Sequence, residues 1–275
     1  MRMAIDSFWH ILRTRSGYQS PRKPRFLVEN LPGWAALVYY AQLLTVVWLE
    51  SRIARKGLYD RKAWANGSLR VFRVVESAGG RFEISGLRSM IDYGGPVVFI
   101  ANHMSLIDPL VLPCILLLFN TVTFVIKEGL LAYPVFESIM KAVDPIAVTR
   151  RSPREDLKVV LTQGQDFIAR GHSVFIFPQA TRSETFDAAN FNSLGVKLAR
   201  KAGVPVVPVA LKMDFQKNGK FIKEMGPVDP KKTLYLKFGE PLMVDGSGQA
   251  THQKVIEFIA ENLTAWGGIV RSGGL

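Results

Sequence analysis

The stretch VVFIANHMSLIDPL, residues 97–110, decides the fold. It opens with a continuous apolar run, which is typical of a strand buried on both faces of a sheet. Asn102 and His103 follow this run directly, and Asp108 stands immediately before Pro109 and further apolar residues. Asp is a preferred helix N-cap and Pro is favoured at the first helical position, so the sequence predicts that a helix begins at Asp108. A buried strand, a polar loop and a helix are the opening of an α/β unit.

Short runs rich in β-branched residues continue on both sides of this stretch. They predict strands at FEIS (82–85), VVFIA (97–101), VTFVI (122–126), DPIAVT (144–149), SVFIF (173–177), VPVVPVAL (204–211) and TLYLKF (233–238). Helices fit between them, and the clearest covers residues 152–171. There Ser152 is the expected N-cap, Pro153 takes the first helical position, Glu155 completes a capping box and Gly171 follows the end. We predict an α/β fold with a mostly parallel or mixed central sheet flanked by helices.

The charge of the chain is unevenly distributed. The 275 residues carry a net charge of +12, and residues 1–76 contribute 13 Lys and Arg against 5 Asp and Glu, a net +8. This balance favours an anionic partner, a class that includes nucleic acids, acidic proteins and anionic membranes. The basic residues flank apolar segments and no nucleic-acid recognition motif accompanies them, so we predict an anionic membrane and no nucleic acid.

Residues 30–49 are free of charge, and 15 of these 20 residues are apolar. About 20 apolar residues cross a bilayer as a helix, and Trp34 and Trp48 stand near the two ends as interfacial aromatics do. Both flanks are basic, however, and a single crossing would leave only one of them on the cytoplasmic side. We therefore expect an interfacial, monotopic helix on the cytoplasmic face of the membrane, with its basic neighbours on anionic headgroups.

A second amphipathic helix is predicted after this segment. On a helical wheel one side collects Leu58, Trp64, Leu69, Val71, Phe72 and Val75, and the other collects Asp60, Lys62, Arg70 and Arg73, with Arg61 as the exception. The alternative is that both helices pack on a soluble domain, because basic residues are common on polar helix faces. We predict two parts: a basic, membrane-associated helical region (1–80) and a catalytic domain (81–275).

His103 and Asp108 are the candidate catalytic pair. Their five-residue spacing would separate them on one helix, but a tight loop after a strand can bring the carboxylate to the imidazole. Such a carboxylate fixes the His tautomer and stabilises the imidazolium that forms when the other ring nitrogen takes a proton. The pair therefore predicts a general base. The four His residues are scattered and Cys114 is the single cysteine, so we predict no metal site.

The loop also carries a family resemblance. Asn102, His103 and Asp108 form the pattern NHxxxxD, which resembles the first motif of the glycerolipid acyltransferases, the family of 1-acyl-glycerol-3-phosphate (lysophosphatidic acid) acyltransferases. Three further blocks occur in the family's order: VIKEGLLAYPVF (125–136) ahead of AVTR (147–150), FPQATRS (177–183) and VPVVPVAL (204–211). Together they cover residues 97–211 and imply the glycerol-3-phosphate acyltransferase-like fold.

The resemblance implies a reaction. In that family the His removes the proton from a free hydroxyl of a lysophospholipid, the oxygen attacks an acyl thioester, and the thiol of coenzyme A or acyl carrier protein leaves. Phosphatidic acid is the product, and the thioester is a co-substrate, with no cofactor. No acyl-enzyme is required, which agrees with the absence of a GxSxG motif and with the position of Cys114 in an apolar helix. We expect an apolar groove to hold the acyl chain.

The resemblance also implies substrate-binding residues. Arg182 corresponds to the arginine that binds the acceptor's phosphate, and Arg150 to the arginine that closes the second block, although the adjacent Arg151 could substitute for it. Guanidinium forks match phosphate oxygens. Thr181 and Ser183 add hydroxyl donors, and Lys127 is placed near the donor or the developing oxyanion. Asn102 and Gln179 complete the predicted set.

One block departs from the family's usual FPEGTRS, because Gln179 and Ala180 replace Glu and Gly. Gln keeps the hydrogen-bonding reach without the charge, and Ala narrows the backbone conformations open to Gly. A lysolipid with another headgroup or a lyso-aminolipid therefore stays open as the acceptor. A non-catalytic membrane or carrier-binding homologue and a lipid hydrolase are the competing classes.

Overall fold

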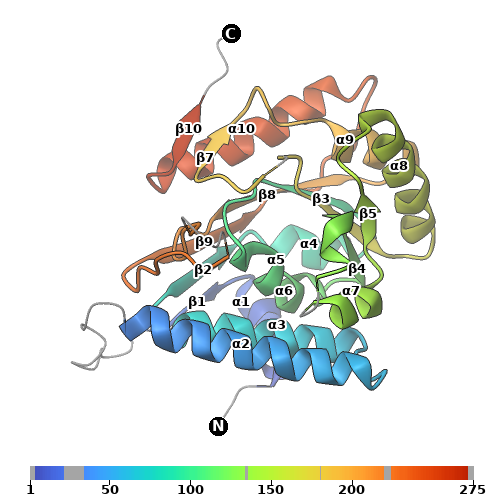
Figure 1. Ribbon diagram of the computed structural model, residues 1–275. Helices are drawn as coiled ribbons and strands as arrows, with labels where there is room; N and C mark the ends of the chain where they lie inside the picture. Colours follow the sequence, from blue (N-terminus) through green and yellow to red (C-terminus); the bar gives the residue numbers. More distant parts are fainter. Residues whose placement is uncertain (1–3, 22–33, 134–135, 180, 220–223, 272–275) are drawn as a thin grey trace.

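The computed structural model describes residues 4–21, 34–133, 136–179, 181–219 and 224–271, with the backbone alone for residues 34 and 35. An eight-stranded sheet forms its centre, in the order β1-β2-β9-β8-β3-β6-β4-β5 (Figure 1). The strands are β1 (Tyr18–Gln19), β2 (Arg81–Ser85), β3 (Val98–Ala101), β4 (Val122–Lys127), β5 (Ile146–Val148), β6 (Ser173–Ile176), β8 (Val206–Lys212) and β9 (Thr233–Phe238). A separate parallel pair joins β7 (Thr185–Asp187) to β10 (Ile269–Arg271).

The five strands β5, β4, β6, β3 and β8 run parallel to one another, whereas β9 is antiparallel to β8. The predicted α/β fold with a mixed sheet is thus confirmed, and all seven predicted strands are present. Strands β1, β7 and β10 were not predicted, because two or three residues are too few to show a strand period. The central strands β3, β6 and β8 are buried along their full length, as their continuous apolar runs require.

Helices cover both faces of the sheet (Figure 1). On one face lie α8 (Pro153–Ala169), α9 (Leu194–Ala202) and α10 (Gln249–Ala265). On the other face α1 (Ile5–Arg15) and α2 (Trp34–Arg55) pack around α3 (Arg61–Ser77), which in turn contacts α5 (Ile107–Val111) and α6 (Pro113–Leu116). The short helices α4 (Arg88–Tyr93) and α7 (Glu137–Val143) and a 3₁₀ turn (Glu128–Leu130) complete the order, and α7 contacts α2.

The helices of the first quarter share the hydrophobic core of the sheet. Phe8 of α1 packs on Phe72 of α3 with ring centroids 5.3 Å apart, and Phe72 stacks on Phe82 of β2 at 3.8 Å. Leu69, Val71, Phe72 and Val75, on the predicted apolar side of α3, are buried in this core. Leu58 was placed on that side in error, because it precedes the helix in the α2–α3 connection and is exposed. The division at residue 80 stays a prediction.

Helix α2 covers the described part of the predicted membrane segment, and residues 30–33 of that segment lie outside the described residues. One face of α2 is buried through Tyr39, Leu43, Val46 and Val47. The opposite face exposes large apolar side chains, namely Leu37, Leu44, Trp48 and Leu49. None of the helices in the described residues combines the length and hydropathy of a membrane-crossing helix.

Helix α8 begins where it was predicted to begin, but without the predicted capping box. Ser152 occupies the N-cap position of α8 and Pro153 the first helical position, but the Ser152 side chain makes no capping bond. Instead the carboxylate of Asp156 accepts the backbone N–H groups of Thr149 and Arg150, at 2.8 and 2.7 Å. These bonds hold Arg150 in a left-handed conformation with φ 59°, so an acidic residue one position later replaces the predicted capping box.

Candidate active site

The predicted site residues gather at one edge of the sheet. Because β3, β6, β4 and β5 are parallel, the loops that follow them leave from the same edge. His103 follows β3, Gln179 follows β6, Lys127 ends β4 and Arg150 follows β5. Ligands of parallel α/β sheets bind at this carboxyl edge. Residues up to 76 positions apart in sequence are therefore brought to one place by topology.

His103 and Asp108 form the predicted pair, with the Nδ1 atom of His103 2.9 Å from the Oδ2 atom of Asp108. Asp108 is fully buried, and Oδ2 also accepts the backbone N–H groups of Met104 and Ser105 at 2.7 and 3.0 Å. Oδ2, which accepts these two N–H groups, also accepts a hydrogen bond from the N–H group at Nδ1 of His103. The Nε2 atom is then the ring nitrogen that can take a proton.

The prediction that Asp108 caps the following helix was wrong. Helix α5 begins one residue earlier, at Ile107, and its N-cap position is Leu106. Asp108 lies inside the first turn, where its carboxylate reaches backwards to the loop and also accepts the Ser105 hydroxyl at 3.0 Å. These bonds fix residues 103–105 around the carboxylate, so the loop geometry and the catalytic pair depend on the same side chain.

The loop after β6 supports the imidazole from a second direction. Phe177 stacks on the His103 ring with centroids 4.2 Å apart. The side-chain oxygen of Gln179 accepts the backbone N–H of His103 at 2.7 Å, and the backbone N–H of Ser183 donates to the His103 carbonyl at 3.0 Å. Phe177 was predicted only as the last residue of a strand. Its place at the start of the FPQATRS block was the available signal for a role at the site.

Asn102 lies behind His103 and is almost fully buried. Its side-chain amide donates to the Leu211 carbonyl at 2.7 Å, and its side-chain oxygen accepts the Leu211 N–H at 2.9 Å. The residue therefore ties the end of β3 to β8 and positions the His103 loop. The structure places the polar atoms of Asn102 on this neighbouring strand rather than at an open surface.

Arg182 is largely buried and pairs with Glu224, with Nη2 and Oε1 2.7 Å apart. Its other terminal nitrogen, Nη1, is buried and has no hydrogen-bond partner in the part of the chain that is described. A buried guanidinium N–H without an acceptor is costly, and an anionic oxygen would satisfy it. The Ser183 hydroxyl donates to the Thr185 carbonyl at 2.8 Å, Thr181 is exposed, and Ala180 lies outside the described residues.

An apolar cavity of about 200 Å³ opens beside the catalytic pair. Its polar lining residues are Glu50, Tyr59, Ser68, His103, Lys127 and Arg150. Its apolar walls come from helices α2, α3, α5 and α7 and from strand β4, and include Val46, Trp64, Leu106, Leu110, Phe124, Ile126 and Ile139. The arrangement places the His103 imidazole, two cations and the Glu50 carboxylate at a mostly apolar cavity, which fits the expected acyl-chain groove.

Neither Cys114 nor Ser105 has the surroundings of a nucleophile for covalent catalysis. Cys114 is fully buried in α6, where desolvation raises the pKa of its thiol to about 12. Its Sγ atom lies 3.1 Å from the Val111 carbonyl. The Ser105 hydroxyl donates to the buried Asp108 carboxylate and has no base of its own there. Among the described residues no group of three or more His, Cys, Asp and Glu could hold a metal ion.

Several known acyltransferases are similar to this chain. The family model described as Acyltransferase matches residues 81–212. A 1-acyl-sn-glycerol-3-phosphate acyltransferase of Pseudomonas aeruginosa is 28% identical over 203 residues, which cover 74% of this chain and 73% of the relative. The chloroplastic 1-acyl-sn-glycerol-3-phosphate acyltransferase BAT2 of Brassica napus is 30% identical over 183 residues, which cover 65% of this chain and 50% of the relative.

The fold has a solved counterpart. The crystal structure of the 1-acyl-sn-glycerophosphate acyltransferase PlsC from Thermotoga maritima matches with a TM-score of 0.60 and 20% identity, over 87% of this chain and 97% of that one. The matched family model and the names of these relatives support an O-acyltransferase. Residues 81–212 of the chain are similar to the acyltransferase family, and they contain the NHxxxxD loop that predicted this resemblance.

Proposed function

We propose that this protein transfers a fatty acyl group from an acyl thioester, acyl-CoA or acyl carrier protein, to the free hydroxyl of 1-acyl-glycerol-3-phosphate, giving phosphatidic acid. The observation that carries the proposal is the His103–Asp108 pair, 2.9 Å apart, at an apolar cavity that Lys127 and Arg150 also line. The names of the Pseudomonas and Brassica relatives support this acceptor.

In this reaction Nε2 of His103 removes the proton from the acceptor hydroxyl. The oxygen attacks the thioester carbonyl, the tetrahedral intermediate collapses, and the carbon–sulfur bond breaks to release the thiol. The proton on the imidazolium returns to the leaving sulfur. The buried Asp108 carboxylate stabilises the imidazolium between these two steps, because a charge pair in a low-dielectric site interacts strongly. The thioester is the only co-substrate that this route needs.

The phosphate of the acceptor is assigned to Arg182 and to the two cations at the cavity. The unpartnered Nη1 of Arg182 supplies a donor, and Lys127 and Arg150 lie at the ends of neighbouring strands. Phosphate oxygens accept from guanidinium groups with charge assistance, which favours an anionic acceptor over a neutral one. The exposed hydroxyl of Thr181 is a further donor in the same loop.

Membrane attachment is assigned to α2. Its exposed apolar face ends near Arg52 and Arg55 in its last turn, and the Arg52 guanidinium lies 4.7 Å from the centre of the Trp48 ring. An amphipathic helix with apolar side chains on one face and cations beside them binds an anionic interface without crossing it. The lysophospholipid acceptor and the thioester donor would then reach the site at the cytoplasmic face.

A panel assay tests the proposal. The purified chain is incubated with acyl-CoA or acyl carrier protein donors and a set of lysolipids, and the products are identified by mass. Formation of phosphatidic acid from 1-acyl-glycerol-3-phosphate is expected, and His103→Ala should abolish it. Turnover of another lysolipid in its place would reassign the acceptor, and the absence of any transfer would overturn the proposal.

A second acceptor class is favoured by Glu224. Its carboxylate is partly exposed and pairs with Arg182, so an acceptor with an ammonium beside its phosphate, or a lyso-aminolipid, would meet both charges. Replacing Glu224 by Gln removes the negative charge and keeps the side chain's size. If the acceptor is 1-acyl-glycerol-3-phosphate, this variant should lower its KM. If the acceptor carries an ammonium group, the same variant should raise the KM for that lipid.

A further inference from the structure

The loop after β5 carries Arg150 to the cavity beside His103. Strand β5 stands at the end of the sheet order and, among the described strands, pairs with β4 alone. In that register Val148 lies opposite Lys127, the other cation at the cavity. The loop begins one residue later and has no neighbouring strand on its outer side in the part of the chain that is described. Another element must therefore fix its conformation.

That element is the carboxylate of Asp156, in the first turn of α8. Its Oδ1 atom accepts the backbone N–H of Thr149 at 2.8 Å and the hydroxyl of the same residue at 3.0 Å. Its Oδ2 atom accepts the backbone N–H of Arg150 at 2.7 Å. The Thr149 hydroxyl oxygen in turn accepts the backbone N–H of Arg151 at 3.1 Å. One side chain thus organises the N–H groups of three successive loop residues, and bonds to an ionised acceptor are stronger than bonds between neutral groups.

The backbone of Arg150 has an unfavourable conformation. Its φ of 59° lies in the left-handed region, where the Cβ atom of any residue except glycine is crowded by the backbone. Such a conformation persists only where the surrounding bonds enforce it, and it is found most often at functional sites. Arg150 lines the cavity, whereas the adjacent Arg151 is not among the described residues that line it. The strained backbone and the cation at the cavity therefore belong to the same residue.

We infer that Asp156 is a positioning residue for the acceptor's phosphate, because its carboxylate fixes Arg150 at the cavity. This inference rests on the proposed function. Without the bonds from Asp156 the loop would relax from the left-handed conformation, and the guanidinium would move away from Lys127. Two neighbouring cations attract a phosphate more strongly than one cation does. The carboxylate thus acts on the acceptor through Arg150 and not by contact with the lipid.

Asp156→Ala tests the inference in the full chain, with acyl-CoA as donor and 1-acyl-glycerol-3-phosphate as acceptor. The KM for the acceptor should rise by about tenfold or more, since the loss of one hydrogen bond to a charged group weakens binding by about this factor. The kcat should change little, because the His103–Asp108 pair belongs to another loop. Glu155→Ala is the matched control and should keep the wild-type KM. It removes a carboxylate from the same turn, and Glu155 makes no side-chain hydrogen bond within the described ranges.

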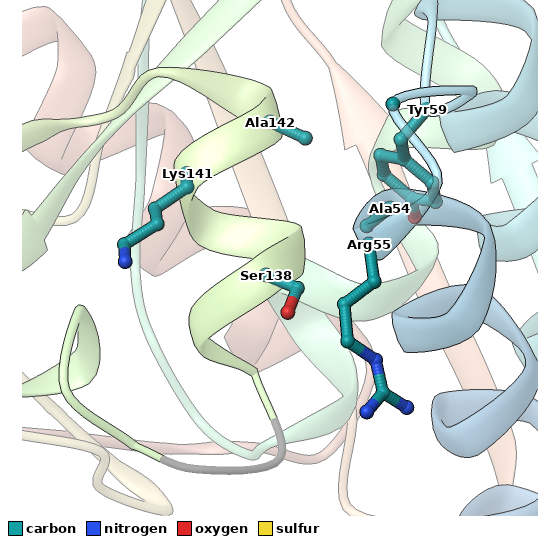
Figure 2. Close-up of a pocket in the computed structure, with 7 residues that line it drawn as sticks. Ala54, Arg55, Tyr59, Ser138, Lys141 and Ala142 are labelled. Atoms are coloured by element: carbon teal, nitrogen blue, oxygen red, sulfur yellow. The ribbon is translucent and has the colours of Figure 1, made fainter.

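A double-mutant cycle separates positioning from a general effect on stability. In an Arg150→Ala background, Asp156→Ala should raise the KM no further, because the arginine through which the carboxylate acts is already absent. The effects of independent sites would multiply instead. Lys141→Ala controls for the loss of a cation elsewhere and should keep the wild-type KM. Figure 2 shows Lys141 on α7, where it lines an open cleft of about 450 Å³ between α7 and the end of α2 and not the cavity.

Circular dichroism verifies that the variants are folded. If Asp156→Ala does not fold, Asp156→Asn takes its place; it keeps one acceptor oxygen and should raise the KM in the same direction by a smaller factor. An unchanged KM in the folded variant, or effects that multiply in the cycle, overturns the inference. A lowered KM also overturns it, because the carboxylate would then compete with the phosphate for Arg150. A wild-type chain that transfers no acyl group from any donor refutes the proposed function, and the inference with it.

Discussion

The side-chain oxygen of Gln179 accepts the backbone N–H of His103 at 2.7 Å, which joins the loop after β6 to the loop after β3. Gln179 is one of the two departures from the family's usual FPEGTRS block. An amide oxygen can accept this bond as a carboxylate oxygen can, so the departure leaves the contact in place. The structure gives Gln179 a positioning role for His103, and its side chain is buried at that contact.

Replacing Gln179 by Leu should leave the His103 N–H without its acceptor. An unsatisfied buried donor costs about 1–3 kcal/mol, which should appear as a lower midpoint of thermal unfolding and as a reduced kcat. Gln179→Glu keeps an acceptor oxygen and should retain most of the activity. Thermal unfolding and steady-state kinetics check both variants, and equal effects of Leu and Glu would show that this bond does not hold the loop.

Asp108→Asn tests the catalytic pair. The amide cannot stabilise an imidazolium as a carboxylate does, and general base catalysis contributes about 10²- to 10⁴-fold to rate, so kcat should fall by this order. The variant must be compared with His103→Ala, which should abolish transfer but leave binding to vesicles unchanged. Circular dichroism verifies that both are folded. Appreciable turnover by folded His103→Ala would remove the proposed mechanism.

The exposed face of α2 should control attachment to membranes. Leu44→Ser combined with Trp48→Ser removes two exposed apolar side chains from this face. We expect weaker sedimentation with vesicles that contain anionic phospholipid, because less apolar area enters the interface. Ile269→Ser is the matched control, since Ile269 is similarly exposed on β10, on the opposite side of the molecule (Figure 1). Equal losses in both proteins would contradict an attachment site on α2.

Cys114 should be inert in the folded protein. Because burial raises the pKa of its thiol to about 12, the reactive thiolate is scarce at neutral pH and the side chain is out of reach. Iodoacetamide at pH 7–8 should leave the native chain unlabelled and active, whereas the unfolded chain should be labelled once, which mass spectrometry detects. Rapid labelling with loss of activity would favour a thiol nucleophile and the competing hydrolase class.

Much of the fold could be predicted from local sequence patterns. The strands β3, β6 and β8 were predictable because each is a continuous apolar run, and burial on both faces of a sheet demands such runs. The helix starts were less predictable. A carboxylate near a helix start can bond forwards or backwards, and Asp108 and Asp156 both bond to the loop before their helix. The direction in which the carboxylate bonds depends on the path of the preceding loop. The type of the acidic residue does not specify that path.

The site was predictable as a set of blocks but not as an arrangement. The NHxxxxD spacing pointed to His103 and Asp108, whose contact forms within one short loop. Phe177 stacks on His103, and Arg182 pairs with Glu224, which lies 42 positions later in the sequence. Each contact joins loops that only the order of the strands brings together. No local pattern encodes such contacts.

The α/β class, the resemblance to the acyltransferases and the pair formed by His103 and Asp108 could be read from the amino-acid sequence, because hydrophobic period and short-range spacing are local properties of a chain. Which residues line the apolar cavity beside His103 follows from the tertiary structure alone. Its walls come from helices before the motif and from strands and helices after it, and α2 contacts both α3 and α7 there. Packing between distant segments is fixed by the burial of the whole chain, and no single stretch of it carries that information.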